Sequence, residues 1–407
     1  MTDILAGIRV VEVSEHGMVP AAGAVLADWG ADVVKVNHPV RGDASRGIWA
    51  FGVPPMVDGF YGLWEPLNRG KRSVGVDLSS ETGHAVLGEL LVGADVFLTN
   101  TLAATRQKLH IEPEDVREFS PSIIYARGGS YGIHGKEGGR GGFDGSAYWG
   151  RSGAGEQLSN DLDDPRGFTG LPGPAFGDSQ TGFALASGIV AALFHRERTG
   201  VAVTVDTSLF AMGTWAMQAS LVLSNLSGQE QLHPLDRTAA NNPINNSYRT
   251  KDGRLLALAM MQADRYWRRL CVLVDRPELA EDPRFVDIAA RTANNLVCIE
   301  ILEGIFATRT MAEWAELLDS DNIPWTPIQR VTDLNDDPQA RANGFVQDVD
   351  YGDGRQITLV SSPIQFDTVA PALRPAPELH AHTEEVLLEH GFDWDRIAAL
   401  KDQGVIA

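Results

Sequence analysis

The stretch GIRVVEVSEHGMVPAAGAVLADWGADVVKVNHP, residues 7–39, decides the fold class of this chain. Its first ten residues, 7–16, hold a β-branched run that predicts a buried strand. Residues 18–30 have the apolar spacing of a helix that ends at a glycine, and residues 31–39 predict a second strand that ends at a proline. A strand, a helix and a strand in this order indicate two parallel strands joined by a crossover.

The same alternation continues along the first half of the chain. Strands are expected in SVGVDLS, DVFLTN and SIIYARGGSYG, and helices in SETGHAVLGELLVGA and TLAATRQKLHI. This alternation predicts an α/β fold with an open, mostly parallel, Rossmann-like sheet and helices on both faces. The segment 132–177 is rich in Gly, Asp and Pro, so we expect loops there, where sites on such scaffolds usually lie.

The pattern changes in the second half of the chain. The stretch NSYRTKDGRLLALAM predicts a hairpin with Asp252 and Gly253 at its turn, and helical patterns follow it. We therefore expect a large α/β domain over 1–224 and a smaller α+β domain over 225–328. The segment 329–407 is too small to fold alone and is expected to return to the large domain.

Composition excludes several classes of function. A formal net charge of −20 argues against nucleic acids and anionic membranes as partners. No apolar run reaches membrane-spanning length, and the N-terminus lacks the features of a signal peptide, so we expect a cytoplasmic protein. Cys271 and Cys298 are too few and too isolated for a disulfide framework or a zinc site, and no metal is expected. His16, His38 and His134 lie in loops without metal-ligand spacing.

Two common site motifs are absent from the sequence. No G-x-G-x-x-G follows the first strand, where the loop is SEHGMVPAAG, so a dinucleotide-binding fingerprint is missing. The phosphate-binding motif G-x-x-x-x-G-K-[ST] is missing too.

Asp178 is the sharpest catalytic candidate. It stands in FGDSQTGFALASGIVAALFHRERTG, residues 176–200, at the head of a long apolar helix, where an aspartate commonly caps the backbone. Gly177 and Gly182 flank it with bare backbone, which suits close approach of a ligand. A carboxylate with N–H donors beside it is also able to act as a nucleophile while those donors stabilise an oxyanion.

Two basic clusters stand out on this acidic chain. NRGKRS places Arg69, Lys71 and Arg72 just before a strand, which forms either a solvated turn or a phosphate clamp. TRQKLH, residues 105–110, has Lys108 on an expected helix. Taken alone, Lys108 is interpreted as a surface lysine.

An ordered set of stretches resembles the class III CoA-transferases, the CaiB/BaiF family, which also includes acyl-CoA racemases. The matching pieces are LAGIRVVEVS, VLADWGADVVKVNHPVRGD, LNRGKRSVGVDLSSETG, DVFLTN, SIIYARGGSYG, GGFDGSAYWGRSG, GDSQTGFALASGIVAALFHRERTG and VDTSLF, in family order. Further similarity, including DNIPWTPIQ, covers most of the rest of the chain. Within the family, the sequence looks closest to transferases that act on aryl-acid CoA esters.

This resemblance implies a mechanism and a site. Asp178 matches the family's nucleophile, which forms a mixed anhydride with the donor acyl group and then an aspartyl-CoA thioester. Coenzyme A, as an acyl-CoA thioester, and a free carboxylic acid are the implied substrates, and the implied assembly is an interlocked homodimer. Carried over position by position, the CoA site comprises His16, Gly17, Met18, His38, Arg69, Lys71, Arg72, Asn100, Thr101, Lys108 and Arg140.

Two alternatives to a transferase stay open. A 2-methylacyl-CoA racemase shares the fold and the CoA site, but the family's racemases have a His-Asp pair where this chain has Phe143 and Asp144. A non-catalytic CoA-binding protein is the second alternative, and the retained Asp178 weighs against it. Formyl and oxalyl substrates are not expected, because the enzymes for them have a glutamine at the position of Gly17.

Overall fold

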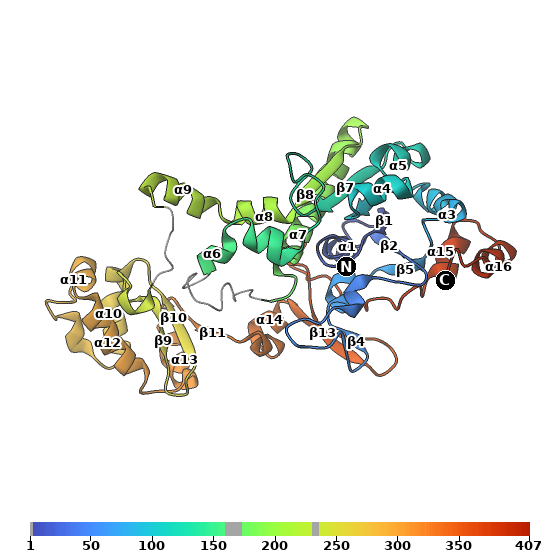
Figure 1. Cartoon of the computed structure of the whole chain (residues 1–407). Coiled ribbons are helices and arrows are strands. Elements are labelled where there is room, and N and C mark those ends of the chain that lie inside the picture. Colours follow the sequence, from blue (N-terminus) through green and yellow to red (C-terminus); the bar gives the residue numbers. More distant parts are fainter. Residues whose placement is uncertain (1–2, 159–172, 230–235, 322) are drawn as a thin grey trace. The chain divides into compact units, whose positions relative to one another are not determined.

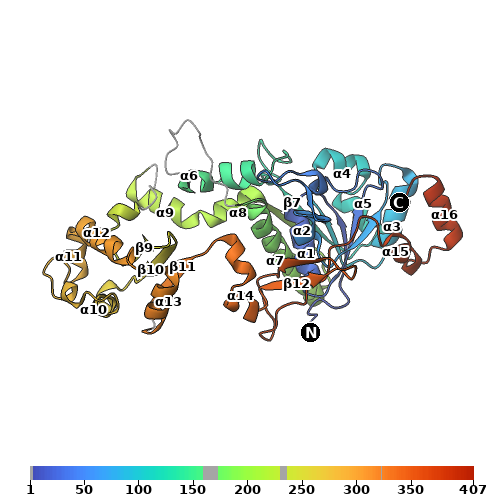
Figure 2. The same ribbon diagram turned by 90° about the horizontal axis from the view of Figure 1, so that it is seen from below.

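The computed structural model describes residues 3–158, 173–229, 236–321 and 323–407, and Figures 1 and 2 show their elements from two sides. The chain divides into two compact units, Met1–Leu232 with Pro338–Ala407, and His233–Asp337. The boundary expected after residue 224 falls inside a helix, α9 (Gln218–Ser227).

A six-stranded sheet forms the centre of the first unit, and every pair of neighbouring strands in it is parallel. The strand order is β5-β2-β1-β6-β7-β8, so the chain winds from β1 to one edge and then continues on the other side. This is the doubly wound order, and its switch point lies between β1 and β6. The bounds are β1 Arg9–Val13, β2 Asp32–Asn37, β5 Arg72–Gly75, β6 Val96–Thr99, β7 Ile124–Gly129 and β8 Thr204–Ser208. The expected parallel α/β sheet is confirmed.

Helices cover both faces of this sheet because both faces are apolar. Side chains of neighbouring strand residues point to opposite faces, so Val10 packs with α1 and α7 while Val11 packs with α3, α5, α15 and α16. The bounds are α1 Met18–Asp28, α3 Glu81–Leu91, α5 Pro113–Phe119, α7 Phe176–Thr199, α15 Thr383–Glu389 and α16 Trp394–Asp402.

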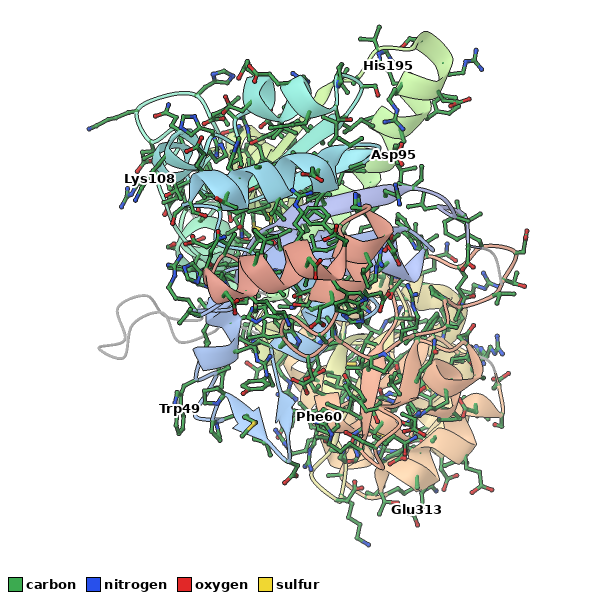
Figure 3. The ribbon with its side chains drawn as sticks, turned by 90° about the vertical axis from the view of Figure 1, so that its right-hand side faces the viewer. Trp49, Phe60, Asp95, Lys108, His195 and Glu313 are labelled. Carbon is green, nitrogen blue, oxygen red and sulfur yellow. The ribbon has the colours of Figure 1, made fainter. Side chains whose placement is uncertain are left out.

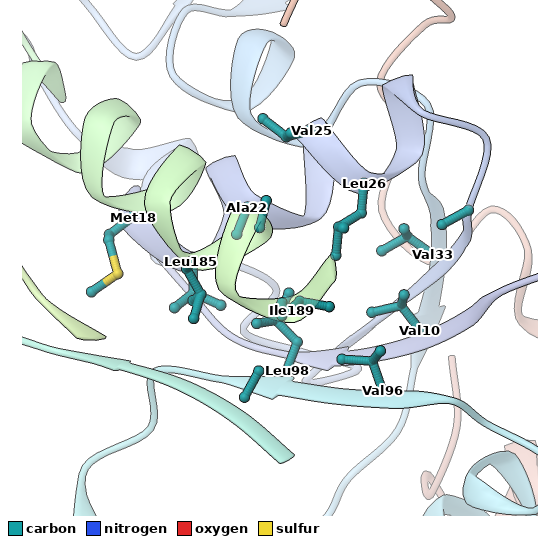
Figure 4. Packing of buried hydrophobic residues seen from close by; sticks show 14 of the residues in the cluster. Val10, Met18, Ala22, Val25, Leu26, Val33, Val96, Leu98, Leu185 and Ile189 are labelled. Atoms are coloured by element: carbon teal, nitrogen blue, oxygen red, sulfur yellow. The ribbon is translucent and has the colours of Figure 1, made fainter. Parts of the chain in front are cut away.

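Helices α1 and α7 pack tightly against each other over one face of the sheet. Figure 4 shows Met18 and Ala22 of α1 beside Leu185 of α7, all in one buried cluster. Gly182 lies at the crossing, since a Cβ there would come within 2.5 Å of the carbonyl oxygen of Met18 and 2.6 Å of the Cβ of Ala21. The missing side chain at this position therefore sets how closely the two helices approach.

The C-terminal segment runs back along β5, the edge strand of the sheet. The N–H of Ser73 donates to Nδ1 of His382 over 3.2 Å, and the N–H of His382 donates to the carbonyl oxygen of Ser73 over 3.0 Å. Further along, Ile406 forms an antiparallel bridge with Val76. The segment thus supplies partners for backbone groups that an open sheet edge would expose.

The segment 132–177 contains more regular structure than its composition indicated. A π-helix, Asp144–Gly150, and helix α6 (Ala154–Leu158) lie in its described part. The glycine-rich composition of this segment does not predict helices. The π-helix is stabilised instead by the burial of Tyr148 and Trp149 in the core. The other elements of the first unit are β3 Met56–Val57, β4 Phe60–Tyr61, α2 Trp64–Asn68, α4 Ala103–Leu109, α8 Leu209–Ala216, α9, α14 Pro338–Ala342, β12 Val346–Asp350 and β13 Gln356–Val360.

The second unit has its own antiparallel sheet and core. Strands β9 (Asn245–Arg249) and β10 (Leu255–Ala259) form the hairpin expected around Asp252 and Gly253, and β11 (Trp325–Ile328) pairs with β10. Its helices are α10 Ala263–Leu273, α11 Ile288–Ala293, α12 Asn295–Phe306 and α13 Met311–Asp319. Apolar side chains of α10, α12 and α13 pack with the strands in a single buried cluster.

Replacing Gly182 by alanine is expected to lower the melting temperature. The added methyl group would meet atoms of α1, and overpacking costs about 1–3 kcal/mol, whereas alanine gains roughly 1 kcal/mol over glycine inside a helix. Gly304 in α12 is the matched control, because nothing lies within 4 Å of a Cβ at that position. Thermal unfolding followed by circular dichroism checks both variants. A Gly182→Ala protein as stable as the Gly304→Ala protein would contradict the packing argument.

Candidate active site

A cavity of about 930 Å³ lies at the carboxyl ends of the parallel strands. Its lining includes Ser14 after β1, His38 after β2, Asp77 after β5, Asn100 after β6 and Ser130 after β7. Open α/β sheets bind ligands at the switch point of their strand order, which here lies between β1 and β6. The fold therefore gathers the ends of separate stretches of sequence around one space.

The loop between β1 and α1 is held beside this cavity in a strained conformation. The side chain of Asn100 accepts from the N–H of Glu15 over 3.1 Å and donates to the carbonyl oxygen of Glu15 over 2.6 Å. The carboxylate of Asp43 accepts from the N–H of His16 over 3.3 Å. His16 has a φ of 69°, which is uncommon for a residue with a side chain. Its imidazole meets the ring of Phe143 edge-on, with 5.3 Å between the ring centroids.

A fully buried network of charges lies behind this loop. Nζ of Lys35 is 3.0 Å from a carboxylate oxygen of Glu12 and 3.0 Å from one of Asp43. Nζ of Lys71 is 2.8 Å from Glu12 and donates to the carbonyl oxygen of Pro20, also over 2.8 Å. Although burial opposes it, the charges of Lys71 and Lys35 hold the pKa of Glu12 below its usual range. The network joins β1, β2 and the start of β5, and through Asp43 it holds the loop at His16.

Asp178 lies in the first turn of α7 and lines the cavity. The expectation that it caps the helix is wrong, because α7 begins at Phe176 and its N-cap is Ala175, which has a φ of 56°. No hydrogen bond from the described part of the chain reaches the Asp178 carboxylate. Burial, and after it the charge of Asp144, raises the pKa of Asp178 to about 7. Such a shift is typical of carboxylates with a chemical role.

One glycine packs against this carboxylate and a second packs against its neighbour Asp144. A Cβ at Gly17 would lie 2.4 Å from Oδ2 of Asp178, so the start of α1 touches the carboxylate. A Cβ at Gly177 would lie 2.4 Å from Oδ1 of Asp144 and 2.4 Å from the ring of Tyr148. Gly177 and Gly182 therefore both allow close packing within the protein. The expected role of these two glycines in ligand approach is not supported.

Most of the expected site residues surround the same cavity. Those that line it are His16, Gly17, Met18, His38, Asn100, Thr101, Arg140 and Asp178. They come from the loops after β1, β2, β6 and β7 and from the start of α7. The guanidinium of Arg140 lies over the ring of Tyr131 and pairs with Glu137.

The basic turn before β5 does not line the cavity. Two side-chain nitrogens of Arg69 donate to Asp28, over 3.0 and 2.6 Å, and two of Arg72 donate to Asp32, over 2.9 and 2.6 Å. Lys71 belongs to the buried charge network. Since all three cations are neutralised inside the chain, the phosphate clamp expected at this turn is not supported, and we leave these residues out of the proposed CoA site.

Other cations line the cavity. Lys108 projects from the surface of α4 (Figure 3), whereas Arg106 of the same helix lines the cavity. Arg41 and Arg127 line it too, and Arg127 pairs with Asp206 on the neighbouring strand. Both residues lie near the ends of strands, Arg41 after the second strand of the sheet and Arg127 in the fifth. Their position was the signal in the sequence, but a search for clusters of charged residues does not find single arginines.

Among the described residues, no helix is long and apolar enough to span a membrane. Within the same part of the chain, no group of three or more His, Cys, Asp and Glu side chains is placed to hold a metal ion. Cys271 and Cys298 are free thiols buried in the core of the second unit.

Comparisons with known proteins match nearly the whole chain to one family. Residues 5–383 match the family model described as CoA-transferase family III. The (R)-2-hydroxy-4-methylpentanoate CoA-transferase of Clostridioides difficile is 31% identical over 404 residues, which cover 99% of this chain and 99% of that protein. The cinnamoyl-CoA:phenyllactate CoA-transferase of Clostridium sporogenes is 28% identical, covering 100% of this chain and 98% of that protein.

A solved structure extends the agreement to the fold. The crystal structure of a CAIB/BAIF family protein from Brucella suis superposes with a TM-score of 0.81 at 27% identity. The superposition covers 95% of this chain and 99% of that chain. Because the family model and the relatives match nearly the whole sequence, the chain belongs to CoA-transferase family III and is an enzyme of that class.

Proposed function

We propose that this enzyme moves CoA from an acyl-CoA thioester to a free carboxylic acid, with Asp178 as the nucleophile. The observation that carries the proposal is the place of the Asp178 carboxylate, which lines the cavity at the switch point of the sheet and touches the bare backbone of Gly17. Relatives that are named as CoA-transferases support the class of reaction.

In this proposal, each step exchanges one acyl bond for another. The Asp178 carboxylate attacks the thioester carbon, the carbon–sulfur bond breaks, and the electron pair leaves on sulfur as the CoA thiolate. The thiolate attacks the aspartyl carbonyl of the mixed anhydride and releases the donor acid, which leaves an aspartyl-CoA thioester. The acceptor carboxylate then takes the CoA by the reverse sequence. Backbone N–H groups at the start of α1 are suited to stabilise the oxyanions, because the first N–H groups of a helix lack a partner within it.

We propose that CoA occupies the loops after β1, β2 and β6. Asn100 and Thr101 line the cavity at the end of β6, and His38 lines it at the end of β2. Arg41 and Arg106 line the cavity and supply positive charge for the phosphates, and Arg106 is held there by Glu112 and by the carbonyl oxygen of Thr101. Arg41 lies near Asp77 but forms no ion pair within the described part of the chain, and we propose that its charge faces the ligand.

We propose that the exchanged acids carry apolar groups. Met18, Ile133, Phe143 and Leu209 give the cavity an apolar portion. The two relatives are named for 2-hydroxy-4-methylpentanoate and for cinnamoyl-CoA with phenyllactate. An aliphatic or aryl carboxylic acid therefore fits this lining better than a short, fully polar acid does.

Replacing Asp178 by alanine or asparagine is expected to lower CoA transfer by roughly 10³-fold or more, because the covalent step loses its nucleophile. The wild-type enzyme incubated with acyl-CoA is expected to gain mass at the peptide that contains Asp178 and to be cleaved there by hydroxylamine. Mass spectrometry of acyl-CoA products and of the protein makes both measurements. Transfer near the wild-type rate in either variant would overturn the assignment.

A racemase would break the carbon–hydrogen bond next to the thioester, whereas a transferase breaks the carbon–sulfur bond. Phe143 replaces the histidine of the family's racemases, but His16 brings an imidazole to within 5.3 Å of the Phe143 ring, measured between centroids. In deuterated water we expect CoA transfer that requires an acceptor acid and leaves the hydrogen on the carbon next to the thioester. Mass spectrometry of a 2-methylacyl-CoA substrate decides the question. Rapid deuterium uptake without an acceptor would establish a racemase.

We propose that the enzyme is a cytoplasmic homodimer that acts without nucleic-acid or membrane partners. Helix α9 has no buried residue, and Leu226 in it is 81% exposed, while Trp215 in α8 is 63% exposed. Several large apolar side chains exposed on neighbouring helices are typical of an interaction site. The cytoplasmic location and the absence of nucleic-acid or membrane partners remain predictions from the sequence.

The oligomeric state is open to direct measurement. Multi-angle light scattering is expected to give twice the chain mass, and a Val222→Glu, Leu226→Glu double variant is expected to shift the protein toward monomer or aggregate, since burial of two carboxylates in an interface is unfavourable. A monomeric wild-type protein at micromolar concentration would rule the homodimer out.

A further inference from the structure

Asp144 is a second carboxylate beside the nucleophile. It begins the π-helix Asp144–Gly150, and its Oδ2 accepts the N–H of Gly177 over 3.1 Å. Gly177 directly precedes Asp178, so this bond holds the first turn of α7 to the π-helix. The contact leaves no room for a side chain, since a Cβ on Gly177 would lie 2.4 Å from Oδ1 of Asp144.

The titratable groups around Asp178 come from two neighbouring elements. His16 belongs to the β1–α1 loop and lines the cavity on the side of Gly17. Asp144 and Tyr148 belong to the π-helix, and the Tyr148 hydroxyl donates to the side-chain carbonyl of Gln180 over 2.9 Å. Of these groups, Asp144 is the one that brings negative charge, and it does not line the cavity.

We propose that Asp144 is a positioning residue that holds Asp178 at the cavity and, through its negative charge, favours the acylated forms of Asp178 over the free carboxylate. The inference rests on the proposed nucleophilic role of Asp178. It concerns a residue that need not touch the substrate, because it acts through the backbone of Gly177 and through its charge.

The balance of charge in the first covalent step supports this role. When a carboxylate oxygen of Asp178 bonds to the acyl carbon and the carbon–sulfur bond breaks, the negative charge leaves Asp178 and ends on the CoA sulfur. The anhydride and the later aspartyl-CoA thioester are both neutral at Asp178. Repulsion by Asp144 is therefore present in the free enzyme and absent in both covalent intermediates, so it lowers the cost of forming them.

The electrostatics of the pair agree with the geometry. Burial first, and the charge of Asp144 second, raises the pKa of Asp178 to about 7. Burial raises the pKa of Asp144 as well, although the N–H groups that it accepts oppose the rise. Because the free carboxylate is the nucleophile, kcat/KM of the wild-type enzyme is expected to increase with pH through about 7.

The test is the pH profile of Asp144→Asn. Removing the negative charge is expected to move the acid limb of kcat/KM to lower pH by roughly 0.5–1 unit. At pH 8.5, where Asp178 is ionised in both proteins, a smaller fraction of the variant is expected to carry the aspartyl-CoA adduct in intact-mass spectra. An acid limb at the wild-type position, with activity reduced equally at every pH, would show a structural role only and overturn the inference.

Two further variants keep the test decisive. Glu197→Gln removes one negative charge from the exposed end of the same helix, and its acid limb is expected to stay at the wild-type position. If Asp144→Asn does not fold, Asp144→Ser replaces it, because a hydroxyl still accepts the N–H of Gly177 without a charge. The same shift to lower pH is expected, and an unshifted limb in that variant would likewise overturn the inference.

Failure of this inference is distinguishable from failure of the proposed function. If the wild-type enzyme transfers no CoA, or if Asp178→Asn transfers it normally, Asp178 is not the nucleophile and both proposals fall. If the wild-type enzyme forms the Asp178 adduct and the acid limb does not move in the Asp144 variants, only the role of Asp144 falls.

Discussion

The close approach of helices α1 and α7 is the constraint on which the site depends. Gly182 lets the helices cross with backbone against backbone, and Gly17 lets the start of α1 reach the carboxylate of Asp178. The starts of both helices therefore lie at the same end of the sheet, where their partial positive charge favours an anion. A side chain at either glycine would push the helices apart and carry Asp178 away from the cavity.

The buried charges give that end of the sheet its rigidity. Glu12, Lys35 and Lys71 connect the first three strands of the winding, and Asp43 extends the network to the strained loop at His16. Breaking such a network by removing one partner is costly, because it leaves an unpaired charge in the interior. Lys71 of the basic turn thus supports the site from behind the loop, while cations on other loops line the cavity.

The site combines several arrangements that are unfavourable for folding alone. His16 has a left-handed backbone, Asp178 is a partly buried carboxylate without a hydrogen bond from the described chain, and Asp144 brings a second negative charge to it. Proteins retain such features where function requires them and where the surrounding packing compensates. Here the compensation comes from the two apolar clusters that cover both faces of the sheet.

The sequence by itself determined the alternation of strands and helices, the parallel sheet and the candidate nucleophile, because hydrophobic periodicity and a short helix-start pattern are local properties of the chain. The π-helix escaped prediction, since burial of Tyr148 and Trp149 stabilises it against its glycine-rich composition. Only the tertiary structure decided which cations line the cavity. Arg72 is neutralised by Asp32 and by Glu389 from the far end of the chain, whereas Arg41 remains at the cavity. Charge pairing across such separations depends on how the strands are ordered in the sheet, which no local pattern encodes.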